Sequence, residues 1–501
     1  MTDLFAILDE DHSRRLSTSA LEAAAAAGAS HTQVRVESIR SQDVGLRDAE
    51  LETSSDSTEF GVGVRVLVDG VFGFAATVER EVDDIANLAR RAVATARAVA
   101  RAQRRAVELA AEPNHGEVRW SSPYRIDPTL VSLAEKVELL GRWSRQILEV
   151  EGIAHVSANV LCVSEEKHYA DSSGTTAFQR RVRLHPAVEA IATHEKAGFE
   201  SMRTVAPPVG RGWEYLLGEG WDFEAELAQL PANLLEKLHS PSVEAGRYDL
   251  VVDPTNLWLT IHESIGHATE LDRALGYEAA YAGTSFATPD KLGTLKYGSS
   301  VMNVTGDRTA EFGLATTAID DEGVEGQSFD LIRDGVLVGY QLDRATASVA
   351  GRDRSNGCAF ADSPLHVPIQ RMANVSLQPA PGDGPSTEEL IARVDRGIYV
   401  VGDKSWSIDM QRYNFQFTGQ RFYRIENGAL VGQLRDVAYQ ATTTDFWGAM
   451  EAVGGRQTYL LAGAFNCGKG QPGQVAPVSH GCPSALIREV SILNARSEGG
   501  R

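Results

Sequence analysis

The amino-acid sequence predicts an α+β fold, in which an N-terminal antiparallel sheet with helices precedes a mainly β C-terminal domain that carries one prominent helix. Three observations favour this class. Stretches of alternating apolar and polar residues recur along the chain. Several of them are separated by Asp-Gly or Asn-Gly pairs, which are signals for two-residue hairpin turns. The 46 glycines among 501 residues also favour many tight turns.

The first half of the chain alternates between helical and strand patterns. Helical patterns cover residues 16–27, about 82–110 and about 133–149, and the second is rich in alanine and arginine. Strand patterns are HTQVRVES and GVGVRVLVDGVFGFAAT, where Asp69-Gly70 marks a hairpin turn. The segments AHVSANVLCV, KHYADSSGT and TAFQRRVRLHPAV are predicted to be three successive antiparallel strands.

The composition changes near Ser240, after a Gly/Pro-rich stretch and the amphipathic segment FEAELAQLPANLLEKLHS. We therefore predict an N-terminal α+β domain at 1–239 and a mainly β C-terminal domain at 240–501. Within the second domain, hairpins are predicted at Asp334-Gly335 and Asn427-Gly428, and a short helix at 387–394. The sequence has no fixed-period repeat of the kind that would indicate a solenoid or a propeller.

Charge and composition exclude several classes of function. The chain has 48 basic and 68 acidic residues and a net charge of −20, so a nucleic-acid partner is not expected. The arginines at 97–105 fit the solvated face of a helix. The N-terminus lacks a signal-peptide pattern and no apolar run reaches the roughly 20 residues that a bilayer demands, which predicts a soluble cytoplasmic protein without a membrane partner. Four scattered cysteines argue against a disulfide framework.

The residues with catalytic potential are concentrated in DLVVDPTNLWLTIHESIGHATELDRALGYE. Asp253 fits a helix N-cap, Pro254 fits the first helical position and Gly276 fits a helix end. A helix of about twenty residues is therefore expected to follow a buried strand at 248–252.

This helix would carry His262, Glu263 and His267. In the familiar zinc signature two histidines stand four residues apart and share one helix face. A spacing of five turns the rings about 140° apart on a regular α-helix. We therefore predict an i to i+5 turn beside Gly266, which would bring both rings to one divalent ion. The same turn would free a carbonyl near residues 262–264 to accept from a ligand histidine or water.

A catalytic zinc takes three protein ligands and keeps one position for water, so a third ligand is needed. Glu270 or Asp272 could supply it from the same helix. Cys467 or Cys482 could supply it from LLAGAFNCGKGQPGQVAPVSHGCPSALIREV, where His480 lies close by. A thiolate is a strong zinc ligand, although a small buried cysteine without a ligand role is common. These residues alone leave the choice open.

Two C-terminal-half motifs, HESIGHATELD and NCGKGQPGQVAPVSHGCP, resemble the TldD/PmbA family of bacterial and archaeal metallopeptidases. The segment SDSTEFGVGVRVLVDGVFGFAAT is similar to the family's N-terminal hairpin, so the resemblance extends over essentially the whole chain. It implies that His262, His267 and Cys467 hold one Zn²⁺ per chain, with other divalent ions possible, and that Glu263 is the catalytic glutamate.

The resemblance also implies an activity and a partner. Family members cleave short or unfolded peptides in an enclosed cavity, and some trim the leader of peptide natural products. Because the chain keeps the histidine motif, it resembles the catalytic TldD type, and its expected partner is a PmbA/TldE-like subunit or a second copy of itself. The ion would polarise the scissile carbonyl and activate water, while Glu263 would take the proton and return it to the leaving amine.

Two features fall outside the family pattern. Cys482 with the neighbouring His480 leaves open a ligand exchange, a redox role or a plain core cysteine. The segment ATELDRALGYEAAYAGTSFA differs from the usual border of the active site, so substrate preference cannot be carried over.

Two other classes of function compete with peptidase activity. One is a non-catalytic regulator, because relatives have been described as modulators of DNA gyrase, and the other is a metal-dependent amidase of small molecules. A structural metal site has no use for an unligated glutamate beside its first histidine, so Glu263 favours hydrolysis.

Overall fold

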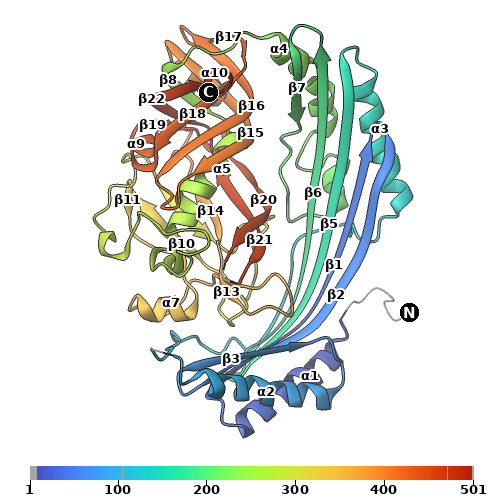
Figure 1. The fold of residues 1–501 in the computed structure, drawn as a ribbon, viewed down its shortest axis with the longest axis vertical. Coiled ribbons are helices and arrows are strands. Elements are labelled where there is room, and N and C mark those ends of the chain that lie inside the picture. The colour runs from blue at the N-terminus through green and yellow to red at the C-terminus, as the bar shows by residue number, and fades with distance from the viewer. Residues whose placement is uncertain (1–7, 104, 471, 499–501) are drawn as a thin grey trace.

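The computed structural model describes residues 8–103, 105–470 and 472–498 and has the predicted α+β architecture. A long, curved sheet from the N-terminal half faces a β-rich C-terminal region (Figure 1). Its strand order is β3-β2-β1-β5-β6-β4, with β7 paired to β6, and every pairing is antiparallel except that of β4 with β6. The strands are β1 His31–Arg47, β2 Glu50–Val68, β3 Val71–Thr77, β4 Glu117–Ser121, β5 Ile153–Asp171, β6 Thr176–His194 and β7 Gly198–Arg203.

Four helices cover this sheet. Helices α1 Glu10–Ala26 and α2 Val82–Val99 pack on β1, β2 and β3 at one end, whereas α3 Leu133–Leu148 and α4 Phe223–His239 share a core with β5 and β6 at the other. The helix predicted at 82–110 was too long. The buried face of α2 ends at Ala96, and the chain beyond Val99 turns back to the β2–β3 hairpin, where the Val107 amide donates to the Gly70 carbonyl.

The prediction of separate strands at AHVSANVLCV and KHYADSSGT was also wrong. AHVSANVLCV and the first five residues of KHYADSSGT belong to the single strand β5, which stays in register with β1 from Asp171 to Ser157, and residues 172–175 form the turn to β6. At the junction of the two segments, the charged side chains of Glu165 and Lys167 are buried inside the sheet. They are stabilised by opposite charges on the neighbouring strands and on the C-terminal region.

We call this set of buried charges the ion cluster. Lys167 donates to Asp321 Oδ1 at 2.7 Å and lies 3.1 Å from Glu37 Oε1, and Glu165 pairs with arginines on β6. Burial raises the pKa of Glu165, but the nearby cations outweigh this and hold its pKa well below the ordinary range. The cluster joins the sheet to residue 321 of the C-terminal region; its members are Arg35, Glu37, Glu165, Lys167, Arg181, Arg183 and Asp321.

Glu165→Gln is expected to lower the free energy of unfolding by about 3 to 5 kcal/mol, because it leaves two buried arginines without their carboxylate. Urea unfolding measures this loss. A carboxylate with a depressed folded-state pKa contributes its full stability above its unfolded-state pKa, so the deficit should shrink as the pH falls below about 4.5. Glu189→Gln, an exposed change on β6, is the control. A loss below about 1 kcal/mol would mean that the ion cluster stabilises the fold no more than an exposed surface ion pair does.

The C-terminal region is built around a closed barrel. Its strands follow the order β15-β8-β22-β18-β16, and β15 also pairs with β16, which closes the ring. Strand β17 extends β16, and β19 pairs with β22. The strands are β8 Gly246–Val252, β15 Arg396–Ile408, β16 Asn414–Glu426, β17 Ala429–Leu434, β18 Val437–Thr442, β19 Met450–Val453 and β22 Ala485–Asn494.

Smaller β elements pack beside the barrel. They are a four-stranded sheet in the order β11-β10-β9-β14 and two hairpins, β12-β13 and β20-β21. Their bounds are β9 Val304–Asp307, β10 Ser328–Arg333, β11 Val336–Leu337, β12 Ala359–Phe360, β13 Ile369–Gln370, β14 Asn374–Leu377, β20 Leu460–Lys469 and β21 Gln474–Cys482.

All three predicted hairpin turns are confirmed. Asp69, Asp334 and Asn427 have φ of 51°, 48° and 49°, and the glycine after each also has a positive φ, as a type I′ turn requires. The predicted short helix is α8 Thr387–Ile391. Other short helices of the C-terminal region are α7 Arg344–Val349, α9 Thr443–Gly448 and α10 Ala495–Glu498. Among the described residues, no helix is long and apolar enough to cross a bilayer.

Candidate metal centre

The helix α5 Pro254–Ile261 begins directly after β8. Asp253 is its N-cap, as predicted: its side chain accepts from the Thr255 amide at 2.9 Å, and Pro254 occupies the first turn. The prediction of one helix of about twenty residues was wrong. The chain passes through a π-helical turn at His262–Gly266 and a 3₁₀ turn at His267–Thr269 before the short helix α6 Leu271–Ala274.

The predicted i to i+5 turn is confirmed. The His267 amide donates to the His262 carbonyl, so the backbone is wider here than in a regular α-helix. As a result the rings of His262 and His267 lie on one side, with centroids 4.7 Å apart. Two histidines five residues apart can therefore contact the same metal ion when the backbone between them contains this turn.

A carbonyl near residues 262–264 was predicted to accept from a ligand histidine or water. At Ser264 the carbonyl oxygen accepts from the Tyr297 hydroxyl and not from a ligand histidine. The Ser264 hydroxyl accepts from Trp447 Nε1 at 2.9 Å, and Gln341 Nε2 donates to the Gly266 carbonyl at 2.7 Å. The wide turn is therefore stabilised by buried side chains from distant parts of the chain.

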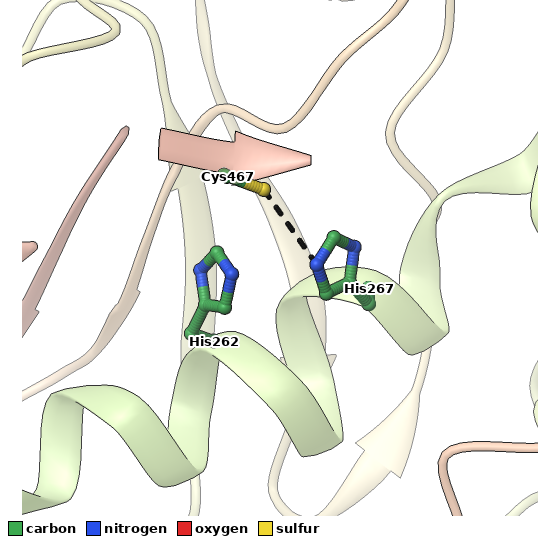
Figure 2. Close-up of side chains that lie close together, drawn as sticks. All are labelled: His262, His267 and Cys467. Atoms are coloured by element: carbon green, nitrogen blue, oxygen red, sulfur yellow. Dashed lines mark hydrogen bonds between the residues drawn. The ribbon is translucent and has the colours of Figure 1, made fainter. Parts of the chain in front are cut away.

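Three potential metal donors converge beside this turn. His262 and His267 point from the helix towards Cys467 on β20 (Figure 2), and their donor atoms all lie within 4.8 Å of one another. The distance from Cys467 Sγ to His267 Nε2 is 3.6 Å. Two ligands of a tetrahedral zinc ion are separated by about 3.5 Å, so this donor set fits a zinc ion. It is the only such group of three or more side chains in the part of the chain that the structure describes.

Glu270 and Asp272, the other possible ligands on this segment, make different contacts. Glu270 Oε2 lies 2.8 Å from His267 Nδ1, and its other oxygen accepts from Lys469 Nζ at 3.0 Å. Asp272 accepts from the same ammonium at 2.8 Å. Burial raises the pKa of Glu270, but Lys469 and His267 outweigh it and hold the pKa well below the ordinary range. An ionised Glu270 fixes the Nδ1–H tautomer of His267 and leaves Nε2 facing Cys467.

The cysteines differ in their surroundings. Burial raises the pKa of Cys467, but His267 and Arg371 outweigh it, and the pKa lies below the ordinary value. The shift is towards the thiolate, the form that binds metals. Burial raises the pKa of Cys482 well above the ordinary value, and its thiol donates to the Pro254 carbonyl at 3.5 Å. Cys482 packs against the start of α5, outside the donor group.

Glu263 is beside the donor group but not part of it. Arg412 Nη1 donates to Glu263 Oε2 at 2.7 Å. Both side chains line a cleft of about 490 Å³ that also contains the two histidines and Cys467. The N-terminal sheet supplies part of the opposite wall of the cleft, and the barrel and β20 supply other parts; wall residues include His185, Arg203, Asp403, Lys404 and Trp406.

Two parts of the chain match one protein family. Residues 245–494 match the PmbA/TldA metallopeptidase C-terminal domain, and residues 32–96 match PmbA/TldA metallopeptidase domain 1. The chain belongs to the PmbA/TldD family of metallopeptidases.

Curated relatives are similar along most of the chain. A metalloprotease of Methanocaldococcus jannaschii is 27% identical, over 93% of this chain and 97% of its own length. A metalloprotease TldD homolog of Haemophilus influenzae is 26% identical over 89% of each chain. A zinc metalloprotease TldD homolog of Saccharolobus solfataricus is 27% identical, over 54% of this chain and 57% of its own.

Solved structures share the fold. TldE from Thermococcus kodakarensis superposes with a TM-score of 0.73 at 16% identity, covering 95% of this chain and 99% of its own. A Thermotoga maritima protein described as a proposed modulator of a DNA gyrase has a TM-score of 0.75 at 17% identity, covering 96% and 100%. At such low identity, the similarity supports the architecture alone.

Two contacts in this TldD-family metallopeptidase were not predicted. Lys469 follows Cys467 by two residues on a strand, so its inward direction could have been read from the strand period. Arg412 lies in the turn between β15 and β16 with a positive φ of 63°, and no sequence pattern links it to Glu263. Strained backbone of this kind is concentrated at functional sites.

Proposed function

We propose that this metallopeptidase hydrolyses short or unfolded peptides with one zinc ion per chain, held by His262, His267 and Cys467, and with Glu263 as the general base. The observation that carries the proposal is the convergence of three soft or borderline donors beside an unligated glutamate in an open cleft. The zinc assignment is also supported by the name of the Saccharolobus solfataricus relative.

The chain's own residues have distinct roles in this reaction. A bound zinc ion would supply Lewis acidity towards the scissile carbonyl and the attacking water. Glu263 would accept the proton from that water and deliver it to the leaving amine. Arg412 holds one carboxylate oxygen of Glu263, which restricts the orientation of the base. The Cys467 thiolate cancels part of the ion's charge, so the centre should be a milder Lewis acid than one with three imidazoles.

The membership of the family also supports proposals for the substrate and the partner. We propose unfolded peptide segments as substrates, including leader segments of peptide natural products, and the cleft of about 490 Å³ between the sheet and the barrel is the proposed binding site. We propose a TldE-like subunit or a second copy of this chain as the partner, supported by the fold shared with TldE from Thermococcus kodakarensis.

Metal removal is expected to abolish cleavage of an internally quenched unfolded peptide, and one equivalent of zinc is expected to restore it. Elemental analysis should find about one ion per chain. The assay includes a small amide as the competing substrate class. Peptide cleavage that persists after complete removal of the metal would contradict the proposal, whereas cleavage of the small amide alone would favour the amidase. A protein that binds zinc but cleaves neither the peptide nor the small amide would favour the non-catalytic regulator.

A further inference from the structure

His480 is a buried histidine of β21 that lies outside the donor group but contacts one of its members. Its Nε2 is 2.8 Å from His262 Nδ1, and its Nδ1 is 2.8 Å from the Val375 carbonyl oxygen. Its side chain has no exposed surface. The sequence had left its role open, and the structure places it directly behind the first histidine of the motif.

The two hydrogen bonds determine where the protons lie. A carbonyl oxygen only accepts, so His480 Nδ1 must carry a proton and donate to Val375. A neutral imidazole has a single N–H, so His480 Nε2 is an acceptor and His262 Nδ1 must be the donor. His262 then has its second nitrogen, Nε2, without a proton, as a metal ligand requires.

The opposite charge state would not permit this arrangement. A cationic His480 would carry protons on both nitrogens and would donate to His262 Nδ1, which would move the proton of a neutral His262 onto Nε2. A buried cationic side chain is normally paired with an opposite charge. Within the described chain, the ring nitrogens of His480 contact His262 and the Val375 carbonyl, and neither partner is a carboxylate.

The ring of His480 is held from several sides. The indole of Trp258, one turn before His262 on α5, is nearly parallel to it, with centroids 6.2 Å apart and an interplanar angle of 13°. On either side of His480, the amides of Ser479 and Gly481 donate to side chains of β14, at 3.2 and 2.9 Å. Strand β21, β14 and α5 together therefore fix the position of the acceptor nitrogen.

We propose that His480 is a positioning residue of the metal centre, which sets the tautomer and the ring orientation of His262 through an imidazole-to-imidazole hydrogen bond. This inference rests on the proposed role of His262 as a ligand. His267 is supported differently, because its Nδ1 donates to a carboxylate, Glu270. A carboxylate acceptor raises the basicity of a ligand histidine more than a neutral imidazole does, so His262 is the weaker donor of the two.

The test compares His480→Leu with His480→Gln, whose amide oxygen can still accept from His262 Nδ1. Zinc affinity is measured by competition with a chromophoric chelator, and the geometry of the centre is followed by the absorption spectrum of the cobalt-substituted protein. We expect His480→Leu to bind zinc about 10- to 100-fold more weakly with an altered cobalt spectrum, and His480→Gln to keep most of the affinity.

His168→Leu is the matched control, since His168 is another fully buried histidine whose Nε2 contacts Ser17 far from the centre. It should keep the zinc affinity of the wild type. Unchanged affinity and spectrum in His480→Leu would overturn the inference, as would an equal loss in His480→Gln. A wild-type chain that binds no zinc, or a His262→Ala variant with full zinc occupancy, would instead overturn the proposed function and the inference with it.

Discussion

Glu263→Gln is expected to lower kcat for peptide hydrolysis by about 10²- to 10⁴-fold while the protein retains its metal. The reason is that Glu263 lies beside the donor group without belonging to it. Glutamine has nearly the same shape, and its amide oxygen can still accept from Arg412 Nη1, so the cleft should keep its form. An amide cannot take a proton from water at neutral pH. The variant therefore separates proton handling from metal binding.

The measurement combines steady-state kinetics on an unfolded peptide with elemental analysis of the same preparations. Glu195→Gln is the control, because Glu195 follows His194 as Glu263 follows His262, yet both residues of that pair are exposed at the end of β6. It should leave kcat and metal content unchanged. If Glu263→Gln lost its metal, Glu263 would be a ligand, and if it kept full activity, another group would be the base.

The sequence was most informative where the determining interactions are local. Turns such as Asp334-Gly335 require two positive φ angles, which their residue types provide, so the hairpins were predictable. The π turn could be predicted from the spacing of His262 and His267 because a regular helix would separate the rings. Both conclusions depend on a few consecutive residues and on known backbone geometry.

The interactions that could not be predicted join distant parts of the chain. Barrel closure needs β8 to pair with β15 and with β22, which follow it by well over a hundred residues. The support of the centre is equally non-local, because Lys469 and His480 reach Glu270 and His262 across 199 and 218 positions. A single sequence carries no signal for such pairs, and the C-terminal end of α2 and the continuity of β5 depended on similar distant contacts.

The largest effect on metal binding is expected from substitution of Cys467, whereas substitution of Cys482 should have little effect. Cys467→Ala is expected to weaken zinc binding by about 10²-fold or more, because a three-ligand site loses its anionic donor. In the cobalt-substituted protein it should also remove the thiolate-to-metal charge-transfer absorption. Cys482→Ala should keep both properties, since the Cys482 thiol bonds the Pro254 carbonyl instead of facing the histidines.

Cys482→Ala also serves as the matched control, because both cysteines are buried and belong to the same hairpin. Removing the Cys482 side chain leaves a small cavity beside α5 and should cost about 1 kcal/mol of stability, so the spectra are compared well below either variant's unfolding temperature. Loss of the charge-transfer absorption in Cys482→Ala alone would mean that β21, not β20, supplies the third donor. In the present register of the β20–β21 hairpin, Ala462 pairs with His480. Such a ligand exchange would require the two strands to pair in a different register. It would also separate His480 from His262, so the same pair of variants tests the register on which the proposed centre depends.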